Sequence, residues 1–473
     1  MPVLKKGRID MKRIVSLFLC VLLILTLAAC AGNNSGSKDP TDKENVSQGG
    51  SSSTEIYYLN FKPEISEVYD RIADDFKKET GITLKVVTAA SDTYEQTLTS
   101  EIAKKDAPTI FQINGPIGYR SWKKYCADLK NTELYTFLSD KSLAIKDESG
   151  VYAIPYVVEA YGIIYNEDIT DRYFELNDRQ KEINSMEDIV SFESLKTVVE
   201  DMQKHKDTLE IDGVFASTSF SSGNQWRWTT HLANIPLYYE FAKAGEDKDP
   251  TLTGLAADEI ALDYSDNFRD IFSLYIENST TPKGLLGSKS VNDSMAEFAL
   301  GKAAMVQNGT WAYSEIANVS GNKVDEDDVK MLPIYIGADG EENQGLCVGT
   351  ENYIAVNSQV SQEKQEASIK FLEWLFSSET GKRYVTQELG FISPFNTFED
   401  DEKPSDPLSK EALRWINDEG ARSVPWIFTS FPSEIFKENL GSALLEFIQG
   451  SKDWDYVKQQ TVSSWKTERE NHK

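Results

Sequence analysis

The chain has 473 residues, of which 40% are hydrophobic and 26% are charged, and its formal net charge is −27. This length exceeds what one hydrophobic core usually serves, so we expect two domains or two lobes. The acidity excludes nucleic acid and anionic lipid as partners held by charge, because like charges repel.

The amino terminus predicts a lipoprotein signal. Two basic residues, Lys12 and Arg13, precede an apolar run over residues 14–27, which is shorter than the roughly 18 residues that span a bilayer. The run ends in Leu27-Ala28-Ala29-Cys30, which resembles the bacterial lipoprotein box, where the cysteine is lipidated and the chain is cut before it. We therefore assign residues 1–29 to a signal peptide and Cys30 to lipidation. An ordinary signal peptide with an incidental cysteine is the alternative.

The segment after Cys30 predicts a flexible tether. Residues 31–54 are rich in Gly, Ser, Asn, Asp and Lys and have no apolar periodicity, which is typical of a linker. A lipid anchor, a tether over 30–54 and a soluble body together predict a protein on the extracytoplasmic face of a bacterial cell membrane.

Strands and helices alternate through the next part of the chain. Expected strands lie at Ile56–Asn60, Ile82–Val86 and Thr109–Ile113. Between them, apolar residues recur at helical spacing from Ile65 to Gly81, and a second helix is expected at Tyr94–Lys104. A strand, a helix and a strand in succession predict a parallel sheet, so the first lobe is α/β.

Helical patterns dominate from residue 192 onward. The expected helices of this part are Phe192–Gln203, Asn267–Asn278, Val291–Leu300, Lys364–Phe376 and Ser409–Glu419.

The common catalytic signatures are missing from the sequence. We find no phosphate-binding P-loop, GxGxxG, HExxH, GxSxG or EF-hand loop. Of the three histidines only His231 is a catalytic candidate, and a core or capping role suits it better. We therefore predict no catalytic residue, no cofactor and no metal. The sequence leaves open whether Cys126 and Cys347 pair or stay free.

Four stretches carry a family resemblance. They are Gly150–Ile169, Phe298–Ile316, Tyr353–Val385 and Gly390–Asn396. In this order they resemble the family 1 extracellular solute-binding proteins of carbohydrate ABC transporters, the family that includes the maltose-binding protein. The resemblance covers residues 55–465.

The resemblance implies a type II periplasmic-binding-protein-like fold, an α/β architecture with a ligand cleft between two lobes joined by crossover hinge strands. It places the first lobe at 55–158 and 330–392 and the second, helix-rich lobe at 159–329 and 393–473. It also implies a monomeric binding protein, not an enzyme, that captures a carbohydrate, in particular an oligosaccharide, and delivers it to an ABC import permease.

The candidate ligand contacts are of the types that bind sugars, in which aromatic rings cover C–H faces and polar groups bond hydroxyls. In the second lobe they are Phe220, Trp226, Arg227, Trp228, Asn308, Trp311 and Trp426. At the predicted strand ends and the hinge they are Asn60, Lys62, Glu64, Asn114 and Glu159. For each tryptophan a place in the core is the alternative. Asn114-Gly115 departs from the pattern of the maltose-binding protein, which argues against maltose as the ligand.

Three other functions fit the same sequence. The fold could bind a peptide, a polyamine or a metal chelate, although aromatic residues near amides favour sugar over a dense carboxylate site. A surface glycosidase or polysaccharide lyase needs only two carboxylates, which leave no short signature. A sensory or adhesive lipoprotein would share the anchor and the fold.

Overall fold

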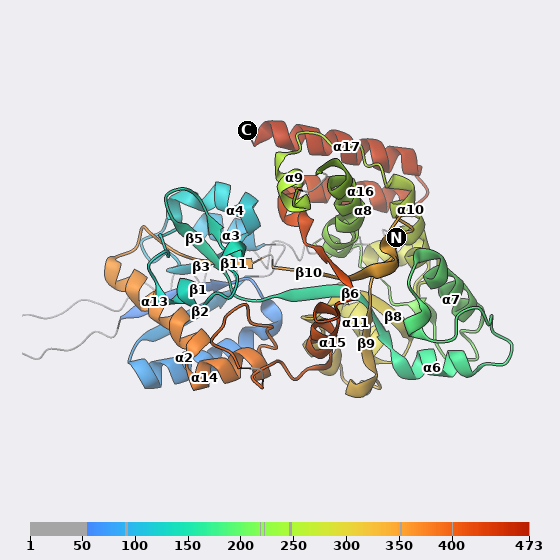
Figure 1. Cartoon of the computed structure of the whole chain (residues 1–473), viewed down its shortest axis with the longest axis horizontal. Coiled ribbons are helices and arrows are strands. Elements are labelled where there is room, and N and C mark those ends of the chain that lie inside the picture. The colour runs from blue at the N-terminus through green and yellow to red at the C-terminus, as the bar shows by residue number, and fades with distance from the viewer. Residues whose placement is uncertain are drawn as a thin grey trace, which may run out of the picture. The chain divides into compact units, whose positions relative to one another are not determined.

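The structure is a computed structural model that describes residues 54–89, 93–217, 219–221, 223–245, 248–350, 352–399 and 401–472. The predicted signal peptide, Cys30 and the predicted tether up to residue 53 lie outside these ranges. Within them, no helix combines the length and the apolar character that crossing a bilayer requires. The described body has two lobes, each built on its own mixed sheet (Figure 1).

The sheet of the first lobe has six strands in the order β2-β1-β3-β11-β5-β4. Its strands are β1 (Glu55–Asn60), β2 (Thr83–Thr88), β3 (Ile110–Asn114), β4 (Ile145–Lys146), β5 (Val151–Pro155) and β11 (Asn352–Val356). Strand β1 runs parallel to β2 and β3, as predicted, whereas β11 is antiparallel to β3 and β5. The helices of this lobe are α2 (Ser66–Thr80), α3 (Tyr94–Glu101), α4 (Gly115–Trp122), α5 (Glu133–Phe137), α13 (Gln362–Ser377) and α14 (Glu379–Arg383).

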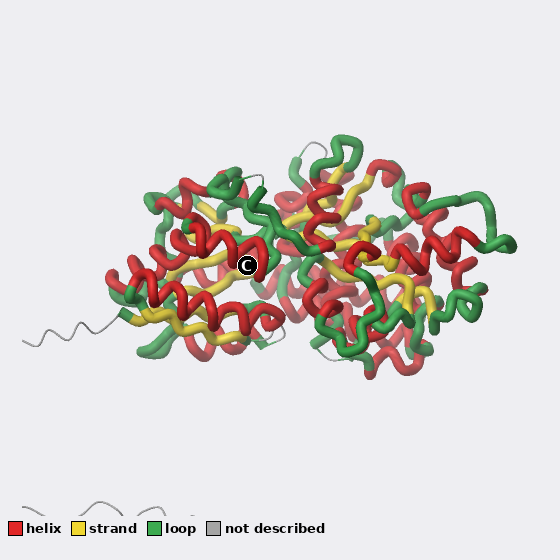
Figure 2. The backbone as a smooth tube through the Cα atoms, turned by 90° about the horizontal axis from the view of Figure 1, so that it is seen from below, coloured by secondary structure: helices red, strands yellow, loops and turns green. Residues whose placement is uncertain are grey.

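The alternation of side chains along β1 explains how helices cover both faces of this sheet. Ile56 and Tyr58 pack in one core with α2 and α13, whereas Tyr57 and Leu59 pack in another with α3 and α4. Helix α2 ends at Gly81, whose φ of 76° lies in the left-handed region that glycine adopts most readily. Figure 2 shows the strands lying among the helices in each lobe.

The sheet of the second lobe has the order β12-β10-β6-β8-β7, and β9 also pairs with β6. Its strands are β6 (Glu159–Asn166), β7 (Gly213–Phe215), β8 (Ala303–Gly309), β9 (Val329–Leu332), β10 (Gln344–Gly349) and β12 (Arg422–Pro425). Its helices are α6 (Glu167–Glu175), α7 (Phe192–Lys204), α8 (Ala233–Gly245), α9 (Pro250–Ala256), α10 (Ser265–Glu277), α11 (Val291–Ala299), α12 (Ala312–Ala317), α15 (Pro407–Ile416), α16 (Glu434–Ile448) and α17 (Trp454–Asn471), with a π-helix η5 (Arg227–Leu232) before α8. The five helices expected from residue 192 onward are α7, α10, α11, α13 and α15.

The chain crosses between the two lobes at residues that differ from two of the predicted lobe boundaries. The first passage lies between β5 and β6, and the second lies between β10 and β11. Residues 330–349 were expected in the first lobe, but β9 and β10 both pair with β6 in the second sheet. Phe395 was expected in the second lobe, but its ring packs against Phe376 of the first, with ring centroids 4.5 Å apart. These boundaries depend on pairing between distant strands, which local patterns do not reveal.

Both cysteines of the body are buried and free. Cys126 lies in the core of the first lobe and Cys347 in that of the second. Burial raises the pKa of each thiol to about 12. The two thiols therefore do not pair with each other.

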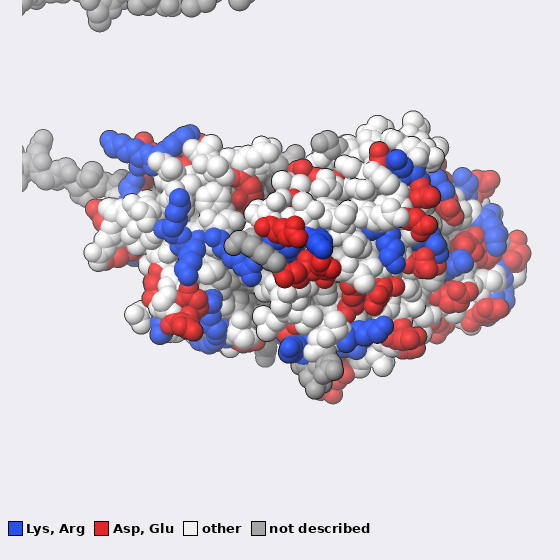
Figure 3. All heavy atoms as spheres, turned by 90° about the horizontal axis from the view of Figure 1, so that it is seen from above, with Lys and Arg blue, Asp and Glu red and all other residues white. Residues whose placement is uncertain are grey.

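On the face drawn in Figure 3, acidic and basic side chains are interspersed.

Candidate functional site

Aromatic side chains of the second lobe gather near the start of β6. We call Trp226, His231, Trp311 and Trp426 the tryptophan cluster. The centroid of the Trp311 ring lies 6.0 Å from that of Trp226, 5.3 Å from that of His231 and 6.3 Å from that of Trp426. The three tryptophans come from the start of η5, the turn after β8 and the end of β12, so only tertiary structure brings them together.

Two glycines hold two of these rings in place. Gly309 ends β8, and a Cβ atom there would overlap the Trp311 ring. Gly349 ends β10, and a Cβ atom there would lie 2.5 Å from Cγ of Trp426. Gly309 pairs with Tyr161 of β6, and Gly349 pairs with Glu159 of the same strand. The close approach that glycine permits therefore seats both rings beside the first residues of β6.

The π-helix η5 positions His231. The Tyr161 hydroxyl donates to the His231 carbonyl at 3.1 Å, and the Tyr161 ring stacks on the imidazole with centroids 4.1 Å apart. Burial, with the Arg227 and Lys437 cations, lowers the pKa of His231 well below its ordinary value. The imidazole is therefore an uncharged packing group at neutral pH.

Charged side chains of both lobes meet beside the tryptophan cluster. Lys62 follows β1 in the first lobe and is only 5% exposed, and its Nζ lies 2.7 Å from Oε1 of Glu159 and 3.6 Å from Oε1 of Glu64. The same Nζ lies 5.9 Å from the centroid of the Trp311 ring. Burial raises the pKa of the Glu64 carboxyl against the opposing effect of Lys62. A first-lobe turn is therefore in contact with residues of the second lobe.

A second pair of charges lies beside Trp226. The Arg227 guanidinium is 1% exposed and lies 3.9 Å from the centroid of the Trp226 ring. Burial lowers the pKa of Arg227 to about 10, whereas the nearby Glu315 carboxylate raises it. Burial raises the pKa of Glu315, and Arg227 opposes that shift. The backbone of Arg227 is fixed by Gln307, whose Nε2 donates to its carbonyl at 2.7 Å.

The structure brings together seven of the predicted ligand contacts. They are Lys62, Glu64, Glu159, Trp226, Arg227, Trp311 and Trp426. Within the described ranges, no three His, Cys, Asp or Glu side chains are grouped so that they could hold a metal ion.

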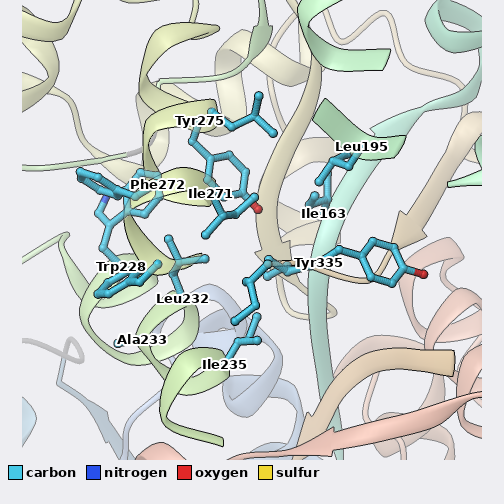
Figure 4. Close-up of a cluster of buried hydrophobic side chains, with 14 of the residues drawn as sticks. Ile163, Leu195, Trp228, Leu232, Ala233, Ile235, Ile271, Phe272, Tyr275 and Tyr335 are labelled. Carbon is cyan, nitrogen blue, oxygen red and sulfur yellow. The ribbon is translucent and has the colours of Figure 1, made fainter. Parts of the chain in front are cut away.

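Five predicted contacts have other surroundings. Phe220 and Trp228 stack on each other in the core, where Trp228 also packs against Phe272 and Tyr275 (Figure 4), so the prediction that they bind ligand is not supported. Asn308 is fully buried in β8, with its Nδ2 3.3 Å from Sδ of Met295.

The other two lie at strand ends of the first lobe, as expected. Asn60 is fully buried and holds the turn after β1, where its Nδ2 donates to the Lys62 carbonyl at 2.7 Å and to Oγ1 of Thr88 at 3.1 Å. Asn114 precedes α4, beside Gly115, whose Cβ position would lie 2.9 Å from Cβ of Thr429 in the second lobe. Asn60 thus positions the Lys62 turn, and Asn114 lies where the two lobes touch.

Sequence reasoning missed Tyr161 and Glu315 and treated His231 as a packing residue only. Two local signals point to the missed residues. Tyr161 follows Glu159 by two positions in β6, so both point to the same face of the sheet. Glu315 follows Trp311 by four positions at the start of α12, so both lie on one side of the helix.

Comparison with known proteins agrees with this architecture. Residues 71–411 match the model of a family described as bacterial extracellular solute-binding protein. The chain is 22% identical over 419 residues to the multiple sugar-binding protein of Streptococcus mutans serotype c, covering 85% of this chain and 87% of that protein. It is 24% identical over 383 residues to the maltodextrin-binding protein MdxE of Bacillus subtilis (strain 168), covering 79% of this chain and 77% of that protein.

Solved structures share the fold. A chitin oligosaccharide binding protein superposes with a TM-score of 0.67 at 16% identity, covering 89% of this chain and all of that one. The solute-binding protein RafE in complex with raffinose superposes with a TM-score of 0.65 at 16% identity, covering 88% of this chain and 100% of that one.

Proposed function

Because the chain belongs to the bacterial extracellular solute-binding protein family, we propose that it captures an oligosaccharide and delivers it to an ABC import permease. The observation that carries this proposal is the tryptophan cluster, in which three indole rings from separate elements converge beside charged groups of both lobes. Sugars present flat C–H faces and hydroxyl edges, which suit indole rings and charged hydrogen-bonding groups. A ligand touching both lobes would also hold them together.

The named ligands of related proteins support a carbohydrate. Two relatives are called sugar-binding and maltodextrin-binding, and solved structures with this fold carry the names of chitin oligosaccharide and raffinose. These sugars differ in ring type and linkage, so they support the class and not one member of it.

We also place the protein on the extracytoplasmic face of the membrane, held there by a lipid on Cys30, as the sequence before the tether indicates. It acts as a monomer and releases its ligand unchanged.

A saccharide panel tests the proposal. Maltotriose, raffinose, stachyose and chitotriose are added separately to the purified full-length protein, and the melting temperature is recorded. A ligand at about one hundred times its Kd stabilises the native state by about 2.7 kcal/mol, so a true ligand raises the melting temperature. The bound sugar should be recovered intact after long incubation. Shortened products would favour a glycosidase, and no response to any saccharide would contradict the proposal.

A further inference from the structure

Buried polar atoms without partners are concentrated around the tryptophan cluster. Among the described residues, none of the three guanidinium nitrogens of Arg227 has a hydrogen-bond partner. The same holds for five neighbouring atoms, which are Nε1 of Trp311, Nε1 of Trp426, Nδ1 of His231, Oε1 of Gln307 and Oε2 of Glu315. Most buried polar groups in proteins are hydrogen-bonded. Their concentration in one place therefore points to a ligand that supplies the bonds.

The unpartnered atoms include donors and acceptors. Arg227 and the two indoles offer only N–H donors, whereas Glu315 and Gln307 offer oxygen acceptors. A hydroxyl group can accept from the first kind and donate to the second, which a carboxylate or a phosphate cannot do when ionised. The mixed set of atoms favours a ligand rich in hydroxyls.

The charges of the site favour an uncharged ligand. Lys62 is already compensated by Glu159 at 2.7 Å and by Glu64 at 3.6 Å. Arg227 and Glu315 bear opposite charges close enough to act on each other, although no ion pair joins them within the described residues. Among the described residues of the site, Lys62 and Arg227 each already face a carboxylate, so neither cation is left over to offset an acidic sugar.

We propose that Arg227 and Glu315 form one subsite for neighbouring hydroxyls of an uncharged sugar ring. The guanidinium donates to one hydroxyl oxygen, and the other hydroxyl donates to the Glu315 carboxylate. Trp226 covers one face of the guanidinium, so the N–H groups along its edge remain directed at the ligand. This inference rests on the proposed function and narrows it to neutral saccharides.

Ligand selectivity is the first test. Isothermal titration compares the four neutral saccharides named above with trigalacturonate, whose rings carry carboxylates. We expect at least one neutral sugar to bind and trigalacturonate to bind at least about tenfold more weakly. Tighter or sole binding of trigalacturonate would overturn the inference and leave the carbohydrate function standing. Binding of none of them would contradict the proposed function itself, and the subsite with it.

The second test uses Arg227→Met, Glu315→Gln and the double variant with the tightest neutral sugar. Each single change should weaken binding by about tenfold or more, because one hydrogen-bond partner is lost. The double variant should lose less affinity than the product of the two single fold-losses, since one ligand bridges both groups. Arg269→Met is the matched control, because Arg269 is a surface residue paired with Asp266 and Asp270, and it should keep its affinity.

Stability separates a binding role from a structural one. Arg227→Met removes a buried cation that has no hydrogen-bond partner among the described residues, so the ligand-free variant should melt at or above the parental temperature. If it melts much earlier and the surviving protein binds normally, Arg227 is structural and the inference is wrong. If it does not fold, the nearly isosteric Glu315→Gln decides, and unchanged affinity of that variant overturns the inference.

Discussion

Two tryptophans of the second lobe have opposite surroundings. Trp228 is 0% exposed and packs against Phe220, Phe272 and Tyr275, whereas Trp311 is partly exposed and lies beside charged groups of both lobes. Trp311→Ala should weaken sugar binding by about 1 to 3 kcal/mol, roughly tenfold to a hundredfold, with the fold retained. Trp228→Ala should instead cost about 3 to 5 kcal/mol of stability.

Calorimetric titration and thermal unfolding of both variants check this expectation. Trp228→Ala should bind normally at a temperature where it is folded. Early melting of Trp311→Ala with normal affinity would place Trp311 in the core and remove it from the site.

The Glu315 carboxyl gives the stability a dependence on pH. Burial raises its pKa above the ordinary value of 4.5. Its contribution to stability is therefore fully present below the unfolded pKa and is lost as the pH rises through the folded pKa. Glu315→Gln cannot ionise and avoids that loss, so the ligand-free variant should melt above the parent at neutral pH. The difference should vanish at about pH 4, near the ordinary carboxyl pKa.

Melting temperatures of both proteins across this pH range test the expectation. Only the difference between them reports on Glu315, because the other carboxyls titrate in both. A constant difference at every pH would show that Glu315 is not shifted.

At the scale of elements, the end of β8 determines where the Trp311 ring lies. A Cβ atom on Gly309 would overlap that ring. Gly309→Ala should therefore push Trp311 out of the tryptophan cluster and weaken sugar binding by about tenfold, at the lower end of the effect of removing the ring. Gly284→Ala is the control, since nothing lies within 4 Å of the new methyl group. If both variants bind like the parent, the packing of the Trp311 ring against Gly309 does not matter for binding.

At the scale of the whole molecule, a ligand that touches both lobes should draw them together. Lys62 with Glu159 and Gly115 with Thr429 are two of the contacts that join the lobes near the site. A ligand shifts such an equilibrium only as far as it binds the closed form better. We expect small-angle X-ray scattering to give a smaller radius of gyration at saturating sugar, and a weaker response for Trp311→Ala at the same concentration. An unchanged radius at saturation would contradict closure.

The proposed lipid anchor is also a property of the whole molecule. Cys30→Ala removes the thiol that would carry the lipid. In cells fed a labelled fatty acid we expect the parent to incorporate label and the variant to lose it, and the variant to be released or left unprocessed. The buried Cys126 offers a matched control, because Cys126→Ala should keep the label. Normal labelling of Cys30→Ala would disprove the assignment.

The sequence by itself determined the local structure of this protein and its class of fold. The alternation in β1, the helical spacing in α2 and the stop at Gly81 are local signals, so the first lobe could be predicted as α/β. Four motifs in order indicated the two-lobed family, and Glu159 and Trp311 of the site lie within them. The other five site residues were predicted from a strand end and from polar and aromatic residues outside these motifs. These signals can be read from the sequence because each depends on residues that are close together along the chain.

Only the tertiary structure decided which residues share the site and where the chain crosses from one lobe to the other. Trp226 and Trp228 lie two positions apart with similar sequence surroundings, yet Trp226 belongs to the tryptophan cluster and stacks on Arg227, whereas Trp228 fills the core. Both tryptophans lie at the start of the π-helix, and packing decides which side of it faces the core. The sheet that receives β9 and β10 likewise depends on pairing with the distant strand β6. Burial and pairing are set by contacts between distant segments, and a single sequence records only which residues are available to make them.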